Sequence, residues 1–496
     1  MVKKFACFPF ALSLSKGLQF AMTLVAACAL SACGVAQLGP DYQRPTMDVP
    51  NSLAAPGQAT DVNWLAWWKG FKDPVLDALL QEAATHSQDL ALASARMAEA
   101  RAVLDQNQSN FYPTVDLNVG STRQRTSQNS ANFVPSIGSY SSSQQLGLSA
   151  SYEVDFWGKY QRADEAARAR LLGQTAARGT VLTTLYANVA QSYFALRALD
   201  AQQTLGEQTL NSRQEALRLQ QLRFQSGVIG EIDLRQAESE ALSVQATLQQ
   251  TRQNRSNTES SLALLLGRKP ADILHPVLGR GADVGVLYAG QVIPANLPSD
   301  VLTLRPDVVS AEQALIAANA DIGQARAAYF PKLSLTAGYG QQSQDLVNLF
   351  DPASLVWNLI GNLTQPIFRA GAADAVVAAA NARQQQALAQ YTQVVQNAFR
   401  DVHDALNNVA VGREIASTTA QRIEALRTTL RLADLRYRGG YAGYLEVLNA
   451  QRDLAQAQVG LIDVQRVQLA AVVALYKALG GGWDANTLGA QAIAKP

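Results

Sequence analysis

The chain has 496 residues, of which 41 are basic and 40 acidic, and its formal net charge is +1. This near-neutral balance argues against nucleic acid as a partner, because nucleic-acid-binding proteins usually present a basic surface. Charged residues make up 16% of the chain, below the roughly 25% of ordinary soluble proteins. We therefore expect a polar surface that is mostly uncharged, as in a wall that meets water on one side and apolar material on the other.

The first 32 residues are predicted to be a lipoprotein signal peptide. Lys3 and Lys4 give it a positive start, and residues 18–30 form an apolar core. The run Leu30-Ser31-Ala32-Cys33 then matches a lipobox, at which the signal is cut and Cys33 receives the lipid. The alternative is an ordinary signal peptide with a stray cysteine. A glycine follows Cys33, where an aspartate would retain a lipoprotein at the inner membrane, so the outer membrane is favoured.

Residues 33–72 are expected to form an extended N-terminal lead-in, because prolines recur in it and apolar residues are few. No cysteine follows Cys33, so the mature chain must be held by packing, oligomerisation or a membrane. No run of about 18 apolar residues follows either, and we therefore expect no membrane-spanning helix.

The rest of the sequence is predicted to be an internal duplication. Residues 111–120 reappear as residues 329–338, at an offset of 331 − 113 = 218. Residues 223–230 match residues 436–443, at an offset of 436 − 223 = 213. We expect a first structural repeat over 73–285, a second over 286–480 and a C-terminal tail over 481–496.

Four segments alternate apolar and polar residues, which is the period of a β-strand with one apolar face. They lie at about 113–124, 144–156, 331–342 and 354–365. Strands of about ten residues with this alternation are typical of outer membrane barrels. A soluble antiparallel sheet is the alternative, but the lipobox and the missing membrane helix favour membrane strands.

Four strands cannot close a membrane barrel, since the smallest such barrels have about eight. An open sheet edge in lipid would leave backbone groups unpaired, at a cost of several kcal/mol each. The chain must therefore share a barrel with copies of itself, and two copies give eight strands while three give twelve. Because eight-stranded interiors are filled by side chains, a conducting pore favours three copies.

Long helices are predicted between the strands, in two proline-free stretches rich in helix-forming residues. Residues 157–225 and 369–438 each span about 70 residues, which gives rods of about 100 Å that must pack in coiled-coil fashion. Each rod ends at a glycine cluster, at 226–230 and 439–443. Helical sequence resumes at once over 231–266 and 444–479, so we expect two helical hairpins with glycine tips.

These motifs together resemble the TolC-type outer membrane efflux channels, in particular the lipid-anchored NodT-like branch that serves tripartite pumps. The resemblance rests on Cys33 followed by Gly39-Pro-Asp-Tyr-Gln-Arg-Pro45, on Leu304-Arg-Pro-Asp-Val308 and on the glycine hairpins of both halves. It covers residues 33–485. It implies an α+β membrane protein: a homotrimer with a 12-stranded transmembrane β-barrel, a mixed equatorial region and a long periplasmic α-helical barrel.

The resemblance also implies a gate just past the second tip. The matching positions are Leu445 at an apolar constriction, Glu446 and Asn449 at acidic rings, and Asp233 at the equivalent acidic site of the first half. Asn449 departs from the usual aspartate, and Asp453, one turn further on, is a candidate to replace it. The alternative is that Glu446 and Asp453 are solvated helix charges.

The expected partners follow from the same resemblance: a periplasmic adaptor, an inner membrane transporter of the RND type and outer membrane lipid. The adaptor-docking positions that flank the tips are Arg223, Ser226, Gly227, Val228, Arg436, Gly439, Gly440 and Tyr441. The alternative for the glycines is helix capping alone.

We expect a passive duct that is not an enzyme and carries no cofactor or metal. His86, His275 and His403 are far apart in sequence, and no phosphate-binding loop, nucleophile elbow or H-E-x-x-H motif occurs. Two alternatives remain: the exit duct of a type I protein secretion system, and a periplasmic coiled-coil lipoprotein adaptor without a pore. The sequence does not identify the cargo or the partner transporter.

Overall fold

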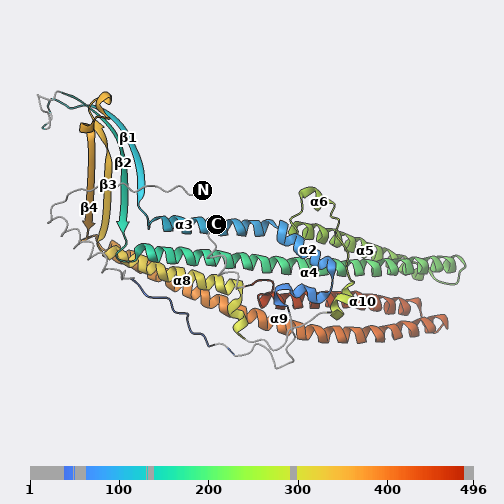
Figure 1. Cartoon of the computed structure of the whole chain (residues 1–496). Helices are drawn as coiled ribbons and strands as arrows, with labels where there is room; N and C mark the ends of the chain where they lie inside the picture. Colours follow the sequence, from blue (N-terminus) through green and yellow to red (C-terminus); the bar gives the residue numbers. More distant parts are fainter. Residues whose placement is uncertain are drawn as a thin grey trace, which may run out of the picture. The chain divides into compact units, whose positions relative to one another are not determined.

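The computed structural model describes residues 38–48, 50, 63–129, 131, 139–290 and 299–484. The predicted signal peptide, the predicted lipidation site Cys33 and most of the predicted tail lie outside these residues. Within them the chain is a mixture of long helices and one β-sheet (Figure 1).

The elements follow the order expected from the sequence, with two strands before each long helical hairpin. In chain order they are η1 (Trp64–Phe71), α2 (Pro74–His86), α3 (Gln88–Ser109), β1 (Thr114–Arg125), β2 (Tyr140–Val154), α4 (Lys159–Gln225), α5 (Glu231–Leu265), α6 (Pro270–Leu274), α7 (Val284–Gly290), η2 (Ser299–Leu304), α8 (Pro306–Arg326), η3 (Ala327–Tyr329), β3 (Lys332–Ser343), η4 (Leu346–Asn348), η5 (Pro352–Ser354), β4 (Leu355–Thr364), α9 (Ala372–Arg438) and α10 (Tyr444–Ala478).

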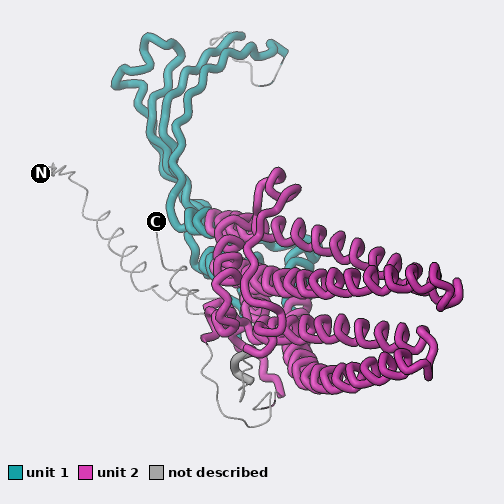
Figure 2. The backbone as a smooth tube through the Cα atoms, turned by 90° about the vertical axis from the view of Figure 1, so that its right-hand side faces the viewer, with its two compact units in different colours: residues 1–42, 104–167, 317–384 teal, residues 43–103, 168–316, 385–496 magenta. Residues whose placement is uncertain are grey.

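The two helical hairpins have the same dimensions. Helices α4 and α9 both have 67 residues, and α5 and α10 both have 35. The starts of α4 and α9 differ by 372 − 159 = 213, and the starts of β1 and β3 by 332 − 114 = 218. The compact units of the fold nevertheless cut across the repeats. One unit contains residues 1–42, 104–167 and 317–384, and the other contains the rest, so each draws on both halves of the chain (Figure 2).

The first unit is built on a four-stranded antiparallel sheet in the order β1-β2-β3-β4. Its register places the apolar positions of all four strands in the same rows. One row runs Leu117, Leu148, Tyr339 and Trp357 from strand to strand, because each of these residues is paired with the next. Since side chains alternate between the faces of a sheet, the chain presents one continuous apolar face.

The opposite face of the sheet carries mainly polar residues and glycines, apart from Val356 and Ile360 of β4. The row next to the apolar one runs Asp116, Ser149, Gly338 and Asn358. On the apolar face, by contrast, Leu117 is 65% exposed and Trp357 is 74% exposed in the single chain. An exposed apolar surface of this extent usually marks a membrane or protein contact.

The second unit has its main hydrophobic core among helices from both halves of the sequence. The core includes Leu76 of α2, Phe194 of α4, Leu262 of α5 and Val472 of α10, all fully buried. Trp67 of η1 stacks on Tyr476 of α10 with ring centroids 5.2 Å apart. These contacts explain why the packed body begins at the tryptophan cluster of the lead-in.

Helix α10 is long and apolar enough to cross a membrane, although the sequence contains no unbroken apolar run of about 18 residues after the signal. Among the described residues, it is the one helix that meets this criterion by length and composition. Polar and charged residues such as Glu446, Arg452 and Asp463 interrupt the apolar residues of α10, so the sequence shows no unbroken apolar run there. Its side chains Leu469, Val472 and Leu475 are fully buried in the cores of the unit, so its apolar character serves internal packing.

A buried hydrogen-bond cluster ties α2 and α4 to the segment before α7. One Asp73 oxygen caps α2 by accepting bonds from Val75 and Leu76 N–H groups. The other accepts the Tyr193 hydroxyl at 2.7 Å and the Ala282 N–H at 3.1 Å. The Tyr193 oxygen in turn accepts the Gly281 N–H at 3.0 Å. The tyrosine hydroxyl therefore supplies one partner to the Asp73 carboxylate and one to the Gly281 N–H group.

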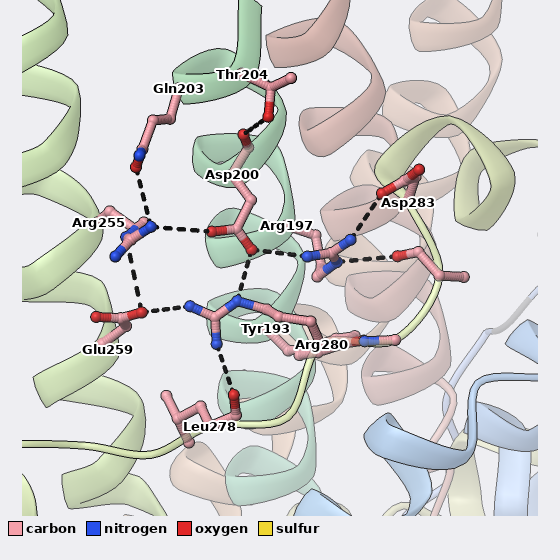
Figure 3. A network of polar contacts seen from close by, with 12 residues as sticks. Tyr193, Arg197, Asp200, Gln203, Thr204, Arg255, Glu259, Leu278, Arg280 and Asp283 are labelled. Carbon is pink, nitrogen blue, oxygen red and sulfur yellow. Dashed lines mark hydrogen bonds and ion pairs between the residues drawn. The ribbon is translucent and has the colours of Figure 1, made fainter. Parts of the chain in front are cut away.

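A charged network surrounds this cluster (Figure 3). Arg197 of α4 donates to Asp200 at 2.7 Å and to Asp283 at 2.8 Å, and Arg280 donates to Asp200 and Glu259. Arginine and carboxylate groups alternate, so each charge meets opposite charge. The network fixes residues 278–283 against α4 and α5.

We expect Tyr193→Phe to lower the free energy of unfolding by about 1–3 kcal/mol, because it leaves a buried carboxylate and a buried N–H with fewer partners. Tyr186→Phe is the matched control, since Tyr186 lies on the same helix and packs its ring against Trp68 at 4.7 Å. Denaturant unfolding followed by helical circular dichroism measures both. Equal midpoints in the two variants would contradict the role of the hydroxyl.

The same variant has an expected pH dependence. Burial, together with the hydrogen bond to Asp73, raises the pKa of Tyr193. The folded protein therefore keeps this proton after the unfolded chain has released it, so stability falls as pH rises above the unfolded tyrosine pKa of about 10. Tyr193→Phe is expected to make that alkaline loss of stability less steep, measured as the unfolding midpoint between neutral and alkaline pH.

Candidate functional site

The two helical tips have the same backbone structure. At the first, the Val228 N–H donates to the Arg223 carbonyl at 2.9 Å, and Gly227 has φ +73°. At the second, the Tyr441 N–H donates to the Arg436 carbonyl at 2.9 Å, and Gly440 has φ +75°. This is the Schellman arrangement, in which a glycine in the left-handed region closes a helix. Capping therefore requires these glycines, whatever else they do.

The tips present most of the predicted docking residues to solvent. Val228 is 71% exposed and Tyr441 is 83% exposed. Ser226, Gly227, Arg436, Gly439 and Gly440 are exposed as well, and Arg223 is half-buried. The predicted docking positions thus form two similar clusters, one at the end of each hairpin.

Arg223 is half-buried because it contacts the other hairpin. Its guanidinium donates to the Tyr437 hydroxyl at 2.7 Å and lies 5.6 Å from the centroid of that ring. Gln220 donates to the same hydroxyl at 3.2 Å. The Tyr437 ring packs in turn against Tyr444 at 5.7 Å. The two hairpins are therefore linked just above their tips by one tyrosine that the sequence analysis did not single out.

The predicted gate residues of α10 share one exposed face. Leu445 is 48% exposed, and Glu446, Asn449 and Asp453 are exposed too. Their spacing of three and four residues places them one above another on a helix. The opposite face of this turn is buried, through Tyr444, Val447 and Leu448.

Glu446 is brought next to one of the predicted docking residues. The Arg436 guanidinium lies 3.3 Å from the Glu446 carboxylate, and both side chains are largely exposed. Exposed pairs of this kind contribute little to stability. The pair does, however, reduce the net charge that Glu446 presents.

Asp233 lies on α5, in the first hairpin, and is half-buried. Its duplicate position is 233 + 213 = 446, so it corresponds to Glu446. By the same offset Ile232 corresponds to Leu445, and Ile232 is 69% exposed. An apolar residue followed by an acidic one therefore stands at the start of both returning helices. The repeat offset alone could have identified Ile232 from the sequence.

A second link between the hairpins is buried and charged. Glu240 of α5 accepts from Arg452 of α10 at 2.6 Å and lies 3.4 Å from Arg213 of α4. Arg213 also donates to Gln451. Breaking such a pair on one side leaves an uncompensated buried charge, which is strongly destabilising. The hairpins are thus tied to each other at two levels, by Tyr437 and by Glu240.

In the described part of the chain no group of three or more His, Cys, Asp or Glu side chains could hold a metal ion.

Comparison with known proteins identifies the class. Residues 79–268 and 297–481 match the family described as outer membrane efflux protein. The cation efflux system protein CusC of Escherichia coli is 35% identical over 464 residues, which cover 92% of this chain and 97% of that protein. The solvent efflux pump outer membrane protein SrpC of Pseudomonas putida is 35% identical over 471 residues, covering 92% and 98%.

A third relative is the probable outer membrane lipoprotein SilC of Salmonella typhimurium, 32% identical over 455 residues, covering 91% and 96%. A crystal structure of CusC superposes with a TM-score of 0.80 at 33% identity, covering 90% of this chain and 99% of that one.

The chain therefore belongs to the outer membrane efflux protein family. It is an outer membrane efflux component with a mixed helical and β fold. The family is one of transport ducts, which agrees with a chain whose exposed features are helix tips and an apolar sheet face.

We expect Gly440→Ala to destabilise the second tip by about 1–2 kcal/mol, because a non-glycine residue in the left-handed region is strained. Open space surrounds the added methyl group, so strain is the main effect. Gly443→Ala is the control, since Gly443 has φ −78° and is also surrounded by open space. Hydrogen exchange of the Tyr441 N–H measures the tip directly. Equal exchange in both variants would contradict the capping role.

Proposed function

We propose that three copies of this chain close a 12-stranded β-barrel in the outer membrane and form a passive exit duct for small molecules. The observation that supports this most strongly is the four-stranded sheet with one continuous apolar face. Strands β1 and β4 each pair on one side only within the described residues. In lipid their free edges must find partners.

The topology of the sheet suits closure by identical copies. Neighbouring strands are antiparallel throughout, so β1 and β4 run in opposite directions. The β4 edge of one copy can therefore pair with the β1 edge of the next in the same antiparallel pattern. Cyclic symmetry then repeats one interface until the ring closes. Three copies give a barrel wide enough to conduct, whereas an eight-stranded interior is filled by side chains.

In this proposal the helical hairpins extend into the periplasm as the walls of a channel. Their exposed tips would dock to an adaptor, which connects the duct to an inner membrane transporter of the RND type. Cys33 would carry the lipid that anchors the chain, and the description of SilC as a lipoprotein supports this. Energy for transport would come from the transporter, since the duct has no chemistry of its own.

The gate in this proposal lies on the exposed stripe of α10. Leu445 would narrow the axis, and acidic groups near it would favour cations. Because Glu446 lies beside Arg436 and position 449 is an asparagine, Asp453 would supply much of the negative charge. Asp233 would add charge from the first hairpin.

The relatives support small-molecule efflux over protein secretion. CusC is described as a cation efflux protein and SrpC as a solvent efflux protein, at the same 35% identity. Two relatives of equal similarity thus serve unlike cargoes, so the cargo of this chain follows from its transporter. A periplasmic adaptor without a pore is disfavoured because it has no use for the apolar sheet face.

The orientation of the sheet gives one test. Leu117→Arg places a charge on the apolar face, which costs about 2–4 kcal/mol near the centre of a bilayer. Asn118→Arg, one residue on, places the same charge on the polar face and serves as the control. We expect only the first to reduce the amount of trimer in outer membrane fractions, measured by native mass analysis in mild detergent. Equal losses, or a monomer in the unmodified protein, would contradict the barrel.

The gate has a test of its own. We expect Leu445→Ala, and separately Glu446→Gln, to raise single-channel conductance in planar bilayers, because each weakens the closed constriction. Val459→Ala is the control, since it is 41% exposed on the same helix and lies about 21 Å further along it. An unchanged conductance in both gate variants would remove the gate from these residues.

A further inference from the structure

The lead-in segment 38–44 lies along one face of helix α8, visible as the dark blue trace beside that helix in Figure 1. Gly39 is in close contact with Gly323. The Asn319 side chain donates to the Pro40 carbonyl at 2.7 Å. Further along, the Arg44 guanidinium binds both oxygens of Glu312, at 2.6 and 2.5 Å.

The geometry matches an extended chain laid antiparallel on a helix. From Glu312 to Gly323 the helix advances 11 residues, which is about 16 Å. From Gly39 to Arg44 the segment advances five residues, which is also about 16 Å when fully extended. Residues 312, 319 and 323 are spaced by seven and four, so they lie on the same helix face. The segment therefore runs antiparallel to α8 along this face, from Gly39 at Gly323 to Arg44 at Glu312.

The first turn of α4 holds the start of the same segment. The Arg162 guanidinium donates to the Leu38 carbonyl at 3.1 Å and to the Asp41 carboxylate at 2.8 Å. A third bond goes to Glu165 on its own helix. The Arg162 side chain is 3% exposed, while Asp41 is 86% exposed. The buried Arg162 side chain thus binds both a backbone carbonyl and a carboxylate of the lead-in segment.

Helices α4 and α8 contribute buried polar residues that bind this segment. Arg162, Glu312 and Asn319 are all buried polar residues, and each has a partner in the segment. Buried polar groups without partners are costly, so the segment satisfies them. The approach at Gly39 is so close that a methyl group there would lie 2.6 Å from the Gly323 Cα, and one on Gly323 would lie 2.3 Å from the Leu38 oxygen. Both glycines are therefore required.

The helix ends that bind this segment are connected directly to the two central strands of the sheet. Helix α4 begins at Lys159, five residues after β2 ends at Val154, and α8 ends at Arg326, six residues before β3 begins at Lys332. The segment thus binds the two helix ends that lead from and into the central strands. Cys33 precedes Leu38 by five residues, so a lipid on Cys33 starts within about 17 Å of this point.

We propose that residues 38–44 are a strap that fixes the lipid anchor to the ends of α4 and α8, so that the lipid enters the bilayer beside the central strands. The proposal rests on the proposed lipidation of Cys33 and on the proposed membrane placement of the sheet. Its physical basis is effective concentration: a short, fixed tether keeps the strands at the membrane surface while they insert. A loose lead-in would anchor the chain equally well but would not orient it.

The first experiment asks whether the strap is held by its ion pair. Chymotrypsin cleaves after Tyr42, which lies within the strap, and access to this bond requires the strap to detach. We expect Arg44→Ala to speed cleavage after Tyr42 about tenfold in the purified full-length protein, because a two-pronged charged contact is lost. Arg427→Ala is the matched control: Arg427 is also 56% exposed and also ion-paired, with Glu424 on α9. An unchanged cleavage rate in Arg44→Ala would overturn the strap.

The second experiment asks what the strap does. We expect Arg44→Ala combined with Asp41→Asn to lower the yield of trimer in the outer membrane several-fold, while mass analysis of the N-terminal peptide shows unchanged acylation. Assembly at the normal level, in variants that are acylated and cleaved faster, would overturn the orienting role. The same mass analysis separates this result from the proposed function, with Cys33→Ala as the unacylated reference. If the wild-type peptide carries no lipid, the proposed lipid anchoring fails. The cleavage experiment then still decides whether residues 38–44 are held against the helices.

Discussion

The structure depends on one constraint: a backbone N–H or C=O group in lipid must have a partner inside the protein. The chain folds four strands whose apolar side chains line up row by row, from Leu117 to Trp357. Such a sheet is suited to lipid on one face but leaves two outer strands half-paired. In the proposed trimer those two strands pair with the strands of neighbouring copies, and lipid covers the apolar side chains that are exposed in the single chain.

The helical part follows a different principle. Rods of 67 residues have no compact core of their own, so they are stabilised where other elements cross them. The largest core gathers η1, α2, α4, α5 and α10 around Tyr193 and Tyr476, and the charged network of Figure 3 surrounds part of it. Nearer the tips the apolar clusters are small, such as the one formed by Ala237, Tyr444 and Leu448. Polar links such as Arg223–Tyr437 accompany them and join the two hairpins.

Much of the secondary structure could be predicted from the sequence, because it depends on local signals. Helices α4 and α9 end at Gln225 and Arg438, where a glycine cluster follows each of them. The alternating segments became strands, although β2 starts at Tyr140 rather than near residue 144. The first residues of β2 are serine-rich and do not alternate between apolar and polar. The alternation in the sequence therefore did not predict that they belong to the strand.

The tertiary contacts could not be predicted in the same way. Arg44 and Glu312 are 268 positions apart, and Arg223 and Tyr437 are 214 apart. Nothing local marks such partners, since an arginine in a lead-in segment or on a helix is usually solvated. The Gly39–Pro45 motif was recognisable as a motif, but its role required the facing glycine, Gly323.

The duplicated tips have a consequence for whatever binds them. Their backbones are equivalent, yet Val228 in one corresponds to Tyr441 in the other, and Ser226 to Gly439. A ring of three chains would therefore look sixfold in outline while its surface chemistry alternates around the circle. A partner made of six like subunits would meet two kinds of neighbour, so its own subunits would have to tolerate both or take up two conformations.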